Sequence, residues 1–361
     1  MNAKRILGRA IHCFPARTKA LIKAAFNPAV YPRVLQIEPT RRCNLRCVMC
    51  PRTIFGGDPK PDMPLDVFKR IVSQFPRTLE AINIQGVGEP LLHEELIDMI
   101  EFAKGLGLRT WFFTNLQHLR EEDAARLVRC GHNEITVSID STNPEQYAQI
   151  RPGGTIENVL ENMRLLNKIK AAHASALPKL TVHAILMRHT LAQIPRMVAT
   201  LRSLGVSEIH FTDLDTYNAR DGLFEDGSSV SAMALCATMT DDEIRSTLDG
   251  IRALTDDTLT VTTPGVSKGI KLHRVDRRGV VTCAELWEMP FVTCDGHMTP
   301  CCYASHPSIA DMGDFSDLRF EQIWFGAPYR MLRWQHVIGR PPAFCRDCRQ
   351  RFRTFAGTVP R

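Results

Sequence analysis

The sequence predicts an α/β protein, in which a partial, open barrel of six βα units precedes a small C-terminal cysteine-rich domain. Segments typical of strands alternate with segments of helical periodicity, which implies parallel βα units. Six such units are fewer than the eight that close a barrel. The region after residue 263 lacks long apolar runs and holds several of the chain's 12 cysteines. We therefore expect a metal site bound by cysteines to stabilise its small core.

The predicted strands are short apolar runs that end at polar or glycine residues, and most are followed by apolar residues at helical spacing. The strands cover 34–40, 81–86, 109–115, 133–140, 179–187 and 208–214. The intervening helices lie within 64–75, 93–105, 121–130, 155–171 and 191–205. A loop rich in glycine, serine and acidic residues is expected at 218–234, followed by a helix at 240–254 and a strand at 258–263.

One face of these strands is polar. Helices cover the outer face of such a barrel, so the outer face must be apolar and the polar side chains face the interior. A closed barrel fills its interior with branched apolar side chains, and a polar interior therefore predicts a cavity for a polar ligand. The alternative is that the strand boundaries are misassigned. The polar positions are Gln36, Glu38, Thr40, Asn83, Gln85, Thr136, Ser138, Asp140, Thr181, His183, His210 and Thr212.

Composition places the chain among ordinary globular proteins. Of its 361 residues, 44% are hydrophobic and 23% charged, which excludes bulk disorder and collagen-like repeats. No apolar run reaches the roughly 18 residues of a membrane helix, and a cytoplasmic location is expected. The predicted domains are a basic N-terminal helical segment (1–33), the barrel (34–225), a helical connection (226–262) and the cysteine-rich domain (263–361).

Positive charge is concentrated at the N-terminus. Seven basic residues and no acidic residue precede Glu38. The charge of this segment is larger than the net charge of the chain, +6, so the rest of the chain is nearly neutral. This segment can pack on the body as an amphipathic helix, or touch an anionic membrane surface or an acidic partner. No nucleic-acid partner is expected.

Three cysteines, Cys43, Cys47 and Cys50, lie in the loop after the first strand. Barrel folds place their chemistry at this end of the strands. Three thiols cannot complete a tetrahedral zinc site, but they can bind three irons of a four-iron cluster and leave the fourth iron open. A structural zinc knuckle or unrelated core thiols are the alternatives.

The Cys-x3-Cys-x2-Cys spacing, joined to Gly86-Val87-Gly88-Glu89-Pro90 after the second strand, resembles the radical S-adenosylmethionine (radical SAM) superfamily. The resemblance implies that S-adenosylmethionine binds the open iron of a [4Fe-4S] cluster. It further implies reductive cleavage to methionine and a 5′-deoxyadenosyl radical, which abstracts hydrogen from a substrate. The protein then supplies binding and orientation.

The resemblance also implies cofactor contacts. The glycine-rich segment would bind the amino group, the end of the fourth strand the ribose, and an arginine the carboxylate. The family's Thr-Asn-Gly is Thr114-Asn115-Leu116 here, and Met49 replaces the family's usual aromatic residue in the cysteine loop, where its thioether can pack on adenine. The implied cofactor residues are Met49, Gly86, Gly88, Glu89, Pro90, Thr114, Asn115, Ser138, Asp140 and Arg151.

The C-terminal cysteines resemble the SPASM/twitch auxiliary-cluster domain of the same superfamily. Its pattern is matched by Cys283, Gly296 and Cys301 and by the later Cys345-x2-Cys348. The full SPASM form has further cysteines after this last pair, so the shortened twitch form is implied, with one auxiliary [4Fe-4S] cluster on Cys283, Cys301, Cys345 and Cys348. Cys294 and Cys302 are further candidate ligands, and a four-cysteine zinc site has the same ligand count.

The resemblance implies a radical SAM oxidoreductase with a reducing partner such as flavodoxin or ferredoxin. We expect a small polar substrate of the sugar, aminocyclitol or nucleoside type and a two-electron oxidation assisted by the auxiliary cluster. The alternatives are a SPASM-type peptide- or protein-modifying maturase and a metal-stapled binding protein without activity. Candidate substrate-facing or catalytic residues, each equally explained as an interior polar residue or a loop cap, are His183, His210, Asp213, Asp215 and Tyr217.

Overall fold

The computed structural model describes residues 31–54, 60–214, 233, 235, 239–264, 283, 285–338 and 340–346. The described residues divide into two units. Those within 1–36, 70–80 and 272–361 form the cysteine-rich unit, and those within 37–69 and 81–271 form the sheet unit. Most of the predicted N-terminal helical segment and nearly all of the predicted loop 218–234 lie outside the described residues.

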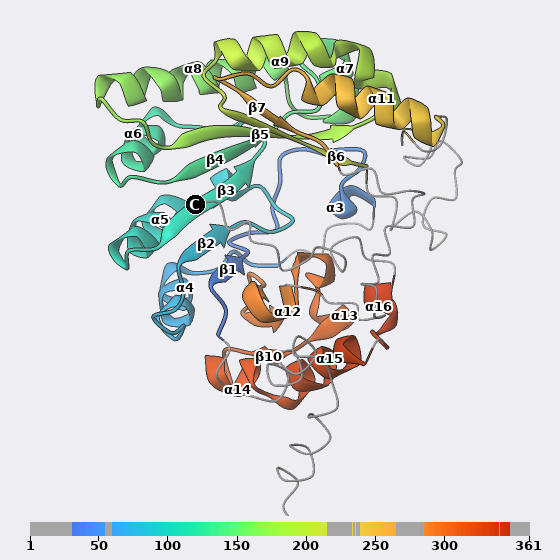
Figure 1. Ribbon diagram of the computed structural model, residues 1–361. Coiled ribbons are helices and arrows are strands. Elements are labelled where there is room, and N and C mark those ends of the chain that lie inside the picture. Colours follow the sequence, from blue (N-terminus) through green and yellow to red (C-terminus); the bar gives the residue numbers. More distant parts are fainter. Residues whose placement is uncertain are drawn as a thin grey trace, which may run out of the picture. The chain divides into compact units, whose positions relative to one another are not determined.

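The sheet unit is built on six parallel strands in sequence order (Figure 1). Parallel pairing in sequence order is what consecutive βα units produce, and the open sheet confirms the predicted partial barrel. Each strand lies within its predicted range and ends one or two residues earlier. The strands are β2 (Ala81–Ile84), β3 (Arg109–Thr114), β4 (Glu134–Ser138), β5 (Lys179–Leu186), β6 (Glu208–Asp213) and β7 (Thr260–Thr262).

Helices follow the strands and lie along one face of the sheet (Figure 1). Several begin at side chains that cap the first turn: Asn143 accepts from the Gln146 amide, and Thr240 forms a capping box with Glu243. The helices are α3 (Pro51–Ile54), α4 (Leu65–Val72), α5 (Leu96–Gly105), α6 (Glu121–Arg129), α7 (Pro144–Ile150), α8 (Ile156–Ala172), α9 (Ile194–Ser203) and α11 (Asp241–Arg252), with 3-10 turns at Pro90–Leu92 and Arg188–Gln193.

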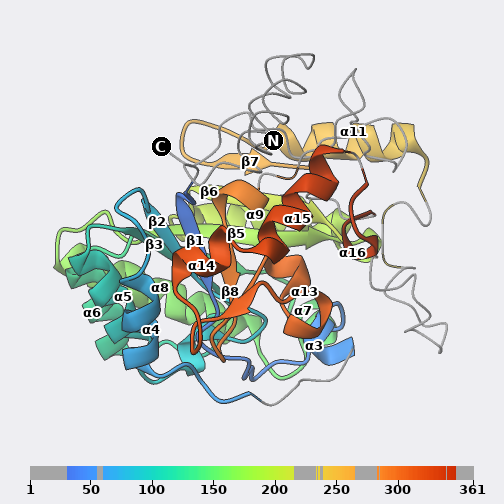
Figure 2. The ribbon, with the colours of Figure 1, turned by 90° about the horizontal axis from the view of Figure 1, so that it is seen from below.

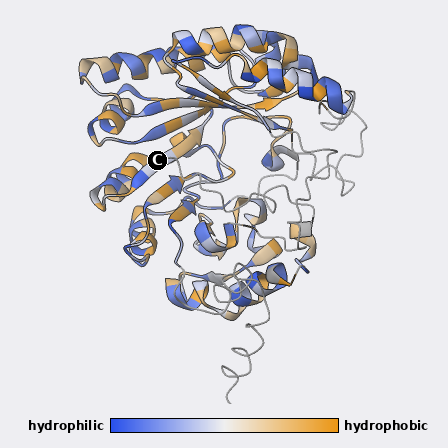
Figure 3. Ribbon diagram, in the orientation of Figure 1, coloured by the Kyte–Doolittle hydropathy of each residue, from blue (hydrophilic) through white to orange (hydrophobic). Residues whose placement is uncertain are grey.

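Burial alternates on β3 and over the carboxyl-terminal half of β5 and most of β6, whereas every residue of β2 is buried. Val182 and Ile209, on the helix-covered face, are fully buried, whereas His183 and Thr212, on the inner face, are only half-buried. Figure 3 shows the corresponding mixture of hydrophobic and hydrophilic residues along the strands. The polar pattern does not extend to β3, whose half-buried side chains include Trp111 and Phe113. The inner face is therefore polar on β4 to β6 and aromatic on β3.

The cysteine-rich unit contains a small antiparallel hairpin, β8 (Phe291–Val292) and β9 (His297–Thr299). Gly296 turns this hairpin in a left-handed conformation with φ of 88°, which a glycine adopts without strain. The hairpin is followed by β10 (Gly313–Asp314), and the strand order continues from β8 to β1 (Val34–Ile37), whose last residue belongs to the sheet unit. The turn at Gly296 leads through β9 to Cys301.

The core of the cysteine-rich unit is aromatic. Arg333 is buried and lies over the rings of Trp324 and Tyr329, at 4.1 and 4.6 Å from their centroids. Figure 2 shows α14 and α15 next to one another. This packed core was not expected from the short apolar runs. The helices of the unit are α12 (Glu285–Glu288), α13 (Pro307–Ala310), α14 (Phe320–Trp324), α15 (Ala327–Val337) and α16 (Ala343–Arg346), with a 3-10 turn at Cys302–Ala304.

Among the described residues, no helix combines the length and the apolar character that crossing a membrane requires.

Candidate functional site

The loop from β1 to α3 presents Cys43, Cys47 and Cys50, all half-buried and unbonded to one another. Arg52 fixes the loop from within, because its Nη2 donates to the carbonyl oxygens of Cys43 (3.1 Å) and Leu45 (2.8 Å). The amide of Cys50 donates to the carbonyl of Cys47 at 3.0 Å, which turns the chain into α3. The loop is thus held by its own backbone and one arginine.

The three thiols interact electrostatically. Burial raises the pKa of the Cys43 thiol, and it raises the pKa of Cys47 to about 11, with further increases from the neighbouring thiols. A cationic partner such as iron would favour the thiolate forms of Cys43 and Cys47. Within the described ranges no three ligand side chains converge as a single metal ion would need, which agrees with thiolates that bind different irons of one cluster. The donor set fits a [4Fe-4S] cluster.

The glycine-rich segment after β2 packs directly on the chain that leads into Cys43. A Cβ on Gly88 would lie 2.3 Å from the carbonyl oxygen of Thr40 and 2.7 Å from that of Arg42. A Cβ on Gly86 would lie 2.2 Å from the buried side chain of Glu38. Real Cβ atoms do not approach this closely, so both positions require glycine for contact between the two segments.

Glu89 joins the glycine-rich segment to the end of β3. Its carboxylate accepts hydrogen bonds from Thr114 Oγ1 (2.6 Å), the Asn115 amide (2.7 Å) and the Leu91 amide (3.1 Å). Burial raises the pKa of Glu89, and the three donors act in the opposite direction. The amide of Glu89 donates to the Arg42 carbonyl at 2.8 Å. Glu89 is thus a structural support for the cysteine loop.

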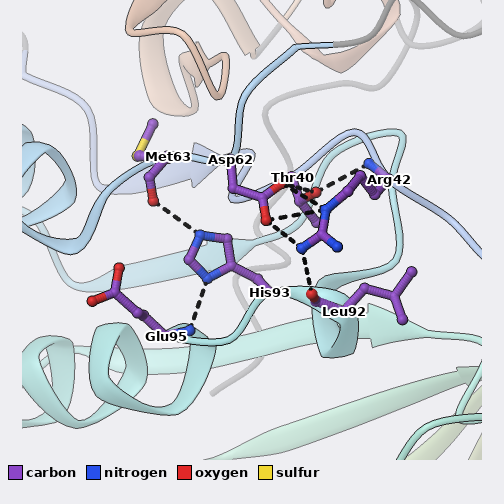
Figure 4. Close-up of polar contacts among 7 residues, drawn as sticks. All are labelled: Thr40, Arg42, Asp62, Met63, Leu92, His93 and Glu95. Carbon is purple, nitrogen blue, oxygen red and sulfur yellow. Dashed lines mark hydrogen bonds and ion pairs between the residues drawn. The ribbon is translucent and has the colours of Figure 1, made fainter.

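A second support lies beside Cys43 (Figure 4). Arg42 pairs with Asp62 and donates from Nη2 to the carbonyl of Leu92 at 2.7 Å, while Thr40 Oγ1 donates to Asp62. His93 accepts from the Glu95 amide at Nδ1 (3.1 Å), so its Nε2 carries the proton and donates to the Met63 carbonyl (2.9 Å). These contacts connect three segments that are distant in sequence.

Arg151 reaches the cysteine loop from the end of α7. Its Nη1 lies 3.7 Å from Cys47 Sγ, and its Nε donates to Asp140 Oδ2 at 2.8 Å. The backbone on either side is bonded to the loop, because the amides of Val48 and Arg46 donate to the carbonyls of Ile150 (3.0 Å) and Pro152 (2.9 Å). The structure thus places Arg151 beside the cysteine loop, and its contact with the cofactor carboxylate, which the resemblance implied, stays a prediction.

Of the other implied cofactor residues, Asn115 contacts the same loop and Met49 belongs to it. Asn115 Nδ2 lies 3.9 Å from Cys43 Sγ and 2.9 Å from Asn44 Oδ1. Leu116, in place of the family's glycine, has a φ of 55°, a left-handed conformation that glycine favours. Met49 packs on the apolar cluster of Ile150, Met187 and Leu214. Ser138 is half-buried at the end of β4.

Of the substrate candidates, the structure places His183 and His210 opposite one another on β5 and β6. His183 Nε2 lies 3.0 Å from Thr212 Oγ1 on the inner face, and burial lowers the pKa of His183 to about 4. His210 is engaged with Glu208 (3.1 Å) and Thr262 (2.8 Å), and strand alternation places Asp213 on the face opposite Thr212. Asp215 and Tyr217 lie outside the described residues.

In the cysteine-rich unit, Cys283 is buried, and burial raises its pKa well above the ordinary value, with further increases from Cys301 and Cys345. Cys301 and Cys345 are thus close enough to influence Cys283 electrostatically, and their assignment with it to an auxiliary cluster stays a prediction. Cys348 lies outside the described residues. Cys294 is buried and Cys302 half-buried, and their assignment as ligands stays a prediction.

Sequence reasoning did not identify Arg52, Asp62 or the bond from Asn115 to Asn44. Arg52 and Asp62 belong to the segment around the cysteine loop, where single charged residues carry no periodic signal. An arginine two residues after the last cysteine of the loop was a usable signal for a residue that caps the loop carbonyls.

Family comparison matches both parts of the chain. The model of the radical SAM superfamily matches residues 37–186, and the model of the SPASM iron-sulfur cluster-binding domain matches residues 283–349. The first range contains Cys43 to Cys50, Glu89 and Arg151, and the second contains all four implied auxiliary ligands.

Curated relatives match the first part of the chain. A probable GTP 3′,8-cyclase of Methanococcus maripaludis is 32% identical over 174 residues, covering 48% of this chain and 56% of the relative. The tungsten-containing aldehyde ferredoxin oxidoreductase cofactor-modifying protein of Pyrococcus furiosus is 29% identical over 189 residues, covering 50% and 51%. The chain spans about half the length of the curated relatives it matches.

Among solved structures, SuiB of Streptococcus suis bound to S-adenosylmethionine superimposes with a TM-score of 0.66 at 14% identity, covering 88% of this chain and 71% of SuiB. At this identity the likeness establishes the fold alone.

Proposed function

The chain belongs to the radical SAM superfamily and carries a C-terminal SPASM domain, and on this basis we propose that it oxidises a small polar metabolite. The two domains imply a [4Fe-4S] cluster with S-adenosylmethionine and one auxiliary [4Fe-4S] cluster. Cys43, Cys47 and Cys50 would hold the first cluster, and Cys283, Cys301, Cys345 and Cys348 the second.

When bound, the first cluster and S-adenosylmethionine would supply a 5′-deoxyadenosyl radical to take a hydrogen atom from a carbinol carbon, the auxiliary cluster would accept the remaining electron, and the hydroxyl proton would pass to solvent. The chain's own residues bind and orient the cofactor and the substrate. In the proposal, Gly86 and Gly88 keep the backbone close to the cofactor's amino group, and Arg151 Nη2, which makes no hydrogen bond to another described residue, receives its carboxylate. Glu89 and Asn115 hold the supporting loops.

The observation that carries the substrate class is the inner face at the carboxyl ends of β4 to β6. Ser138 lies in register with His183, and the His183 ring reaches along β6 to Thr212 Oγ1 at 3.0 Å; all three residues are half-buried. His183 is neutral near pH 7, because burial lowers its pKa to about 4. Hydroxyl and neutral imidazole groups suit hydroxyl, amine or amide groups of a substrate and offer no countercharge to a phosphate. Sugars, aminocyclitols and nucleosides have this chemistry.

Nucleosides stay in the class because GTP, named in the probable GTP 3′,8-cyclases among the relatives, contains a nucleoside, although the inner face offers no countercharge to its phosphates. A one-electron donor such as flavodoxin or ferredoxin is part of the proposal. The competing proposal is that the enzyme modifies a peptide, and the following experiment distinguishes the two substrate classes.

The test uses the full chain, reconstituted anaerobically, with S-adenosylmethionine and a reductant. Cyclitols, sugars and nucleosides deuterated at their carbinol carbons are compared with unstructured peptides deuterated at Cα and Cβ. The proposal expects deuterium in 5′-deoxyadenosine and an equimolar ketone from a member of the first group. Deuterium transfer from a peptide, with none from the small molecules, overturns the proposal.

Thr212→Val tests the inner face in the same assay. Loss of one neutral hydrogen bond should raise KM by roughly 3- to 10-fold with a smaller change in kcat. Thr200→Val on α9, whose hydroxyl bonds to the Arg196 carbonyl at the surface, is the matched control and should change neither. Equal kinetics for Thr212→Val and the wild type would remove this face from the substrate site.

A further inference from the structure

Asp140 follows β4, and both of its carboxylate oxygens are engaged. Oδ1 accepts from the Ile185 amide on β5 at 2.8 Å, and Oδ2 accepts from Arg151 Nε at 2.8 Å. The resemblance had implied a ribose contact for this residue. We propose instead that Asp140 is a positioning residue, which fixes the Arg151 guanidinium against Cys47 so that a positive charge stands beside one thiolate of the cluster.

The pair is buried. The side chain of Asp140 is 0% exposed and that of Arg151 is 9% exposed. A buried ion pair is stable in one geometry when additional hydrogen bonds satisfy its remaining groups, and the Ile185 amide provides such a bond to Asp140. The carboxylate is thereby anchored to the sheet, so it acts as a fixed point for the arginine.

The backbone of Arg151 cannot set the direction of the guanidinium by itself. Its amide donates to the Tyr147 carbonyl at 2.7 Å, which ends α7, and its two neighbours are bonded to the cysteine loop. These bonds place the Cα atom beside the loop. The long side chain still has several rotamers, and the bond from Nε to Asp140 selects the one that brings Nη1 to 3.7 Å from Cys47 Sγ.

A fixed positive charge and an N–H donor at a cluster thiolate stabilise the more negative, reduced cluster. Charge and hydrogen bonds to the sulfurs are among the factors that set the reduction potential of an iron–sulfur cluster. Asp140 is expected to act on the cluster through Arg151. Its loss should therefore have the same effect on the potential as loss of the arginine.

The test is the midpoint potential of the first cluster, measured by EPR on the anaerobically reconstituted full chain without substrate. The cluster is identified as the one whose signal changes on addition of S-adenosylmethionine. In Asp140→Asn a single oxygen replaces two, so the Ile185 amide and Arg151 Nε can no longer both be satisfied. We expect Asp140→Asn and Arg151→Met to shift the potential to more negative values, and the double variant to match Arg151→Met alone.

A shift of the Asp140→Asn potential in the opposite direction would have a different cause. If Asp140 only neutralises an arginine held by other groups, Asp140→Asn leaves an extra positive charge and the potential becomes less negative, which overturns the proposal. An unchanged potential or additive shifts overturn it as well. Asp140→Glu keeps the charge and both oxygens, and its potential should lie between those of the wild type and Asp140→Asn. This variant keeps the proposal testable if Asp140→Asn binds too little cluster to be measured.

Asp98→Asn is the matched control. Asp98 pairs with Arg126 at 2.7 Å between α5 and α6, in a half-exposed position, and should leave the potential unchanged. Because the measurement uses no substrate, its outcome is independent of the proposed substrate class.

Discussion

The Glu89 carboxylate accepts the backbone amide of Asn115 at 2.7 Å, and this bond joins the glycine-rich segment after β2 to the end of β3. Asn115 in turn directs its side-chain amide to Asn44 and Cys43 in the cysteine loop. The acid of the Gly-x-Gly-Glu-Pro motif thus supports the cluster loop from behind.

Glu89→Gln should destabilise the sheet unit. The amide has one acceptor oxygen where the carboxylate uses two, so at least one of Thr114, Asn115 and Leu91 loses its bond in a buried site. The free energy of unfolding should fall by about 1–3 kcal/mol. Urea denaturation measures it, and the affinity for S-adenosylmethionine should fall with it. Unchanged values of both would show that the buried donors find other acceptors.

Gly88→Ala should displace the chain that leads into Cys43. Its Cβ would meet two backbone carbonyl oxygens at 2.3 and 2.7 Å, and backbone moves less easily than a side chain. We expect a loss of roughly 1–3 kcal/mol in stability and a lower iron content of the first cluster. Gly105→Ala is the control, because nothing lies within 4 Å of the added methyl group at the end of α5. Equal iron in both variants would contradict the prediction.

Iron content separates the two cysteine sets. The wild type should bind about eight irons per chain, and the triple change of Cys43, Cys47 and Cys50 to Ala should leave about four and abolish 5′-deoxyadenosine formation. Changing Cys345 and Cys348 to Ala should remove the other four and spare S-adenosylmethionine cleavage. Cys130→Ala, at the end of α6, is the control and should bind as much iron as the wild type. One zinc and four irons in the wild type would make the C-terminal site structural.

Some of this site is visible in the sequence, because its signals are local. The spacing of Cys43, Cys47 and Cys50 and the motif ending in Glu89 identify the cofactor loops, and strand alternation identifies the face that carries His183. The supports of the loop are different. Asp62 pairs with Arg42 across 20 residues, and Asp140 bonds to Ile185 across 45. Such pairs depend on chain folding: Arg42 and Asp62 do not differ in type from ordinary surface residues, and Ile185 bonds through its backbone amide, which no residue type reveals.

The same reasoning applies to the cores. Trp111 and Phe113 alternate correctly for a strand, but alternation gives no information on which aromatic residues occupy an interior otherwise lined by polar groups. In the cysteine-rich unit, Arg333 stacks on Trp324 and Tyr329 and donates to the carbonyl of Leu286, 47 residues away. Periodicity assigns a charged residue in a helix to the surface, so a buried arginine among aromatic rings is not predicted.

Stability should fall on acidification because of His132. This ring is fully buried, bonds through Nδ1 to Thr110 Oγ1 at 2.8 Å and stacks on Phe112, and burial lowers its pKa to about 3. In the unfolded chain the His132 imidazole is protonated as pH falls through about 6.5, whereas in the folded chain it stays neutral down to about pH 3. The free energy of unfolding therefore decreases by about 1.4 kcal/mol per pH unit as pH falls from 6.5 towards 3, and is unaffected by this group above 6.5.

His132→Gln keeps an acceptor for Thr110 and removes the titration. Its apparent thermal midpoint should fall less between pH 7.5 and 5.5 than that of the wild type, although His183, whose pKa is lowered to about 4, leaves a residual slope of the same sign. His118→Gln, at an exposed position, is the control and should retain the full slope. If His132→Gln and the wild type lose stability equally on acidification, the His132 ring is protonated inside the folded protein, and its burial does not exclude the charge.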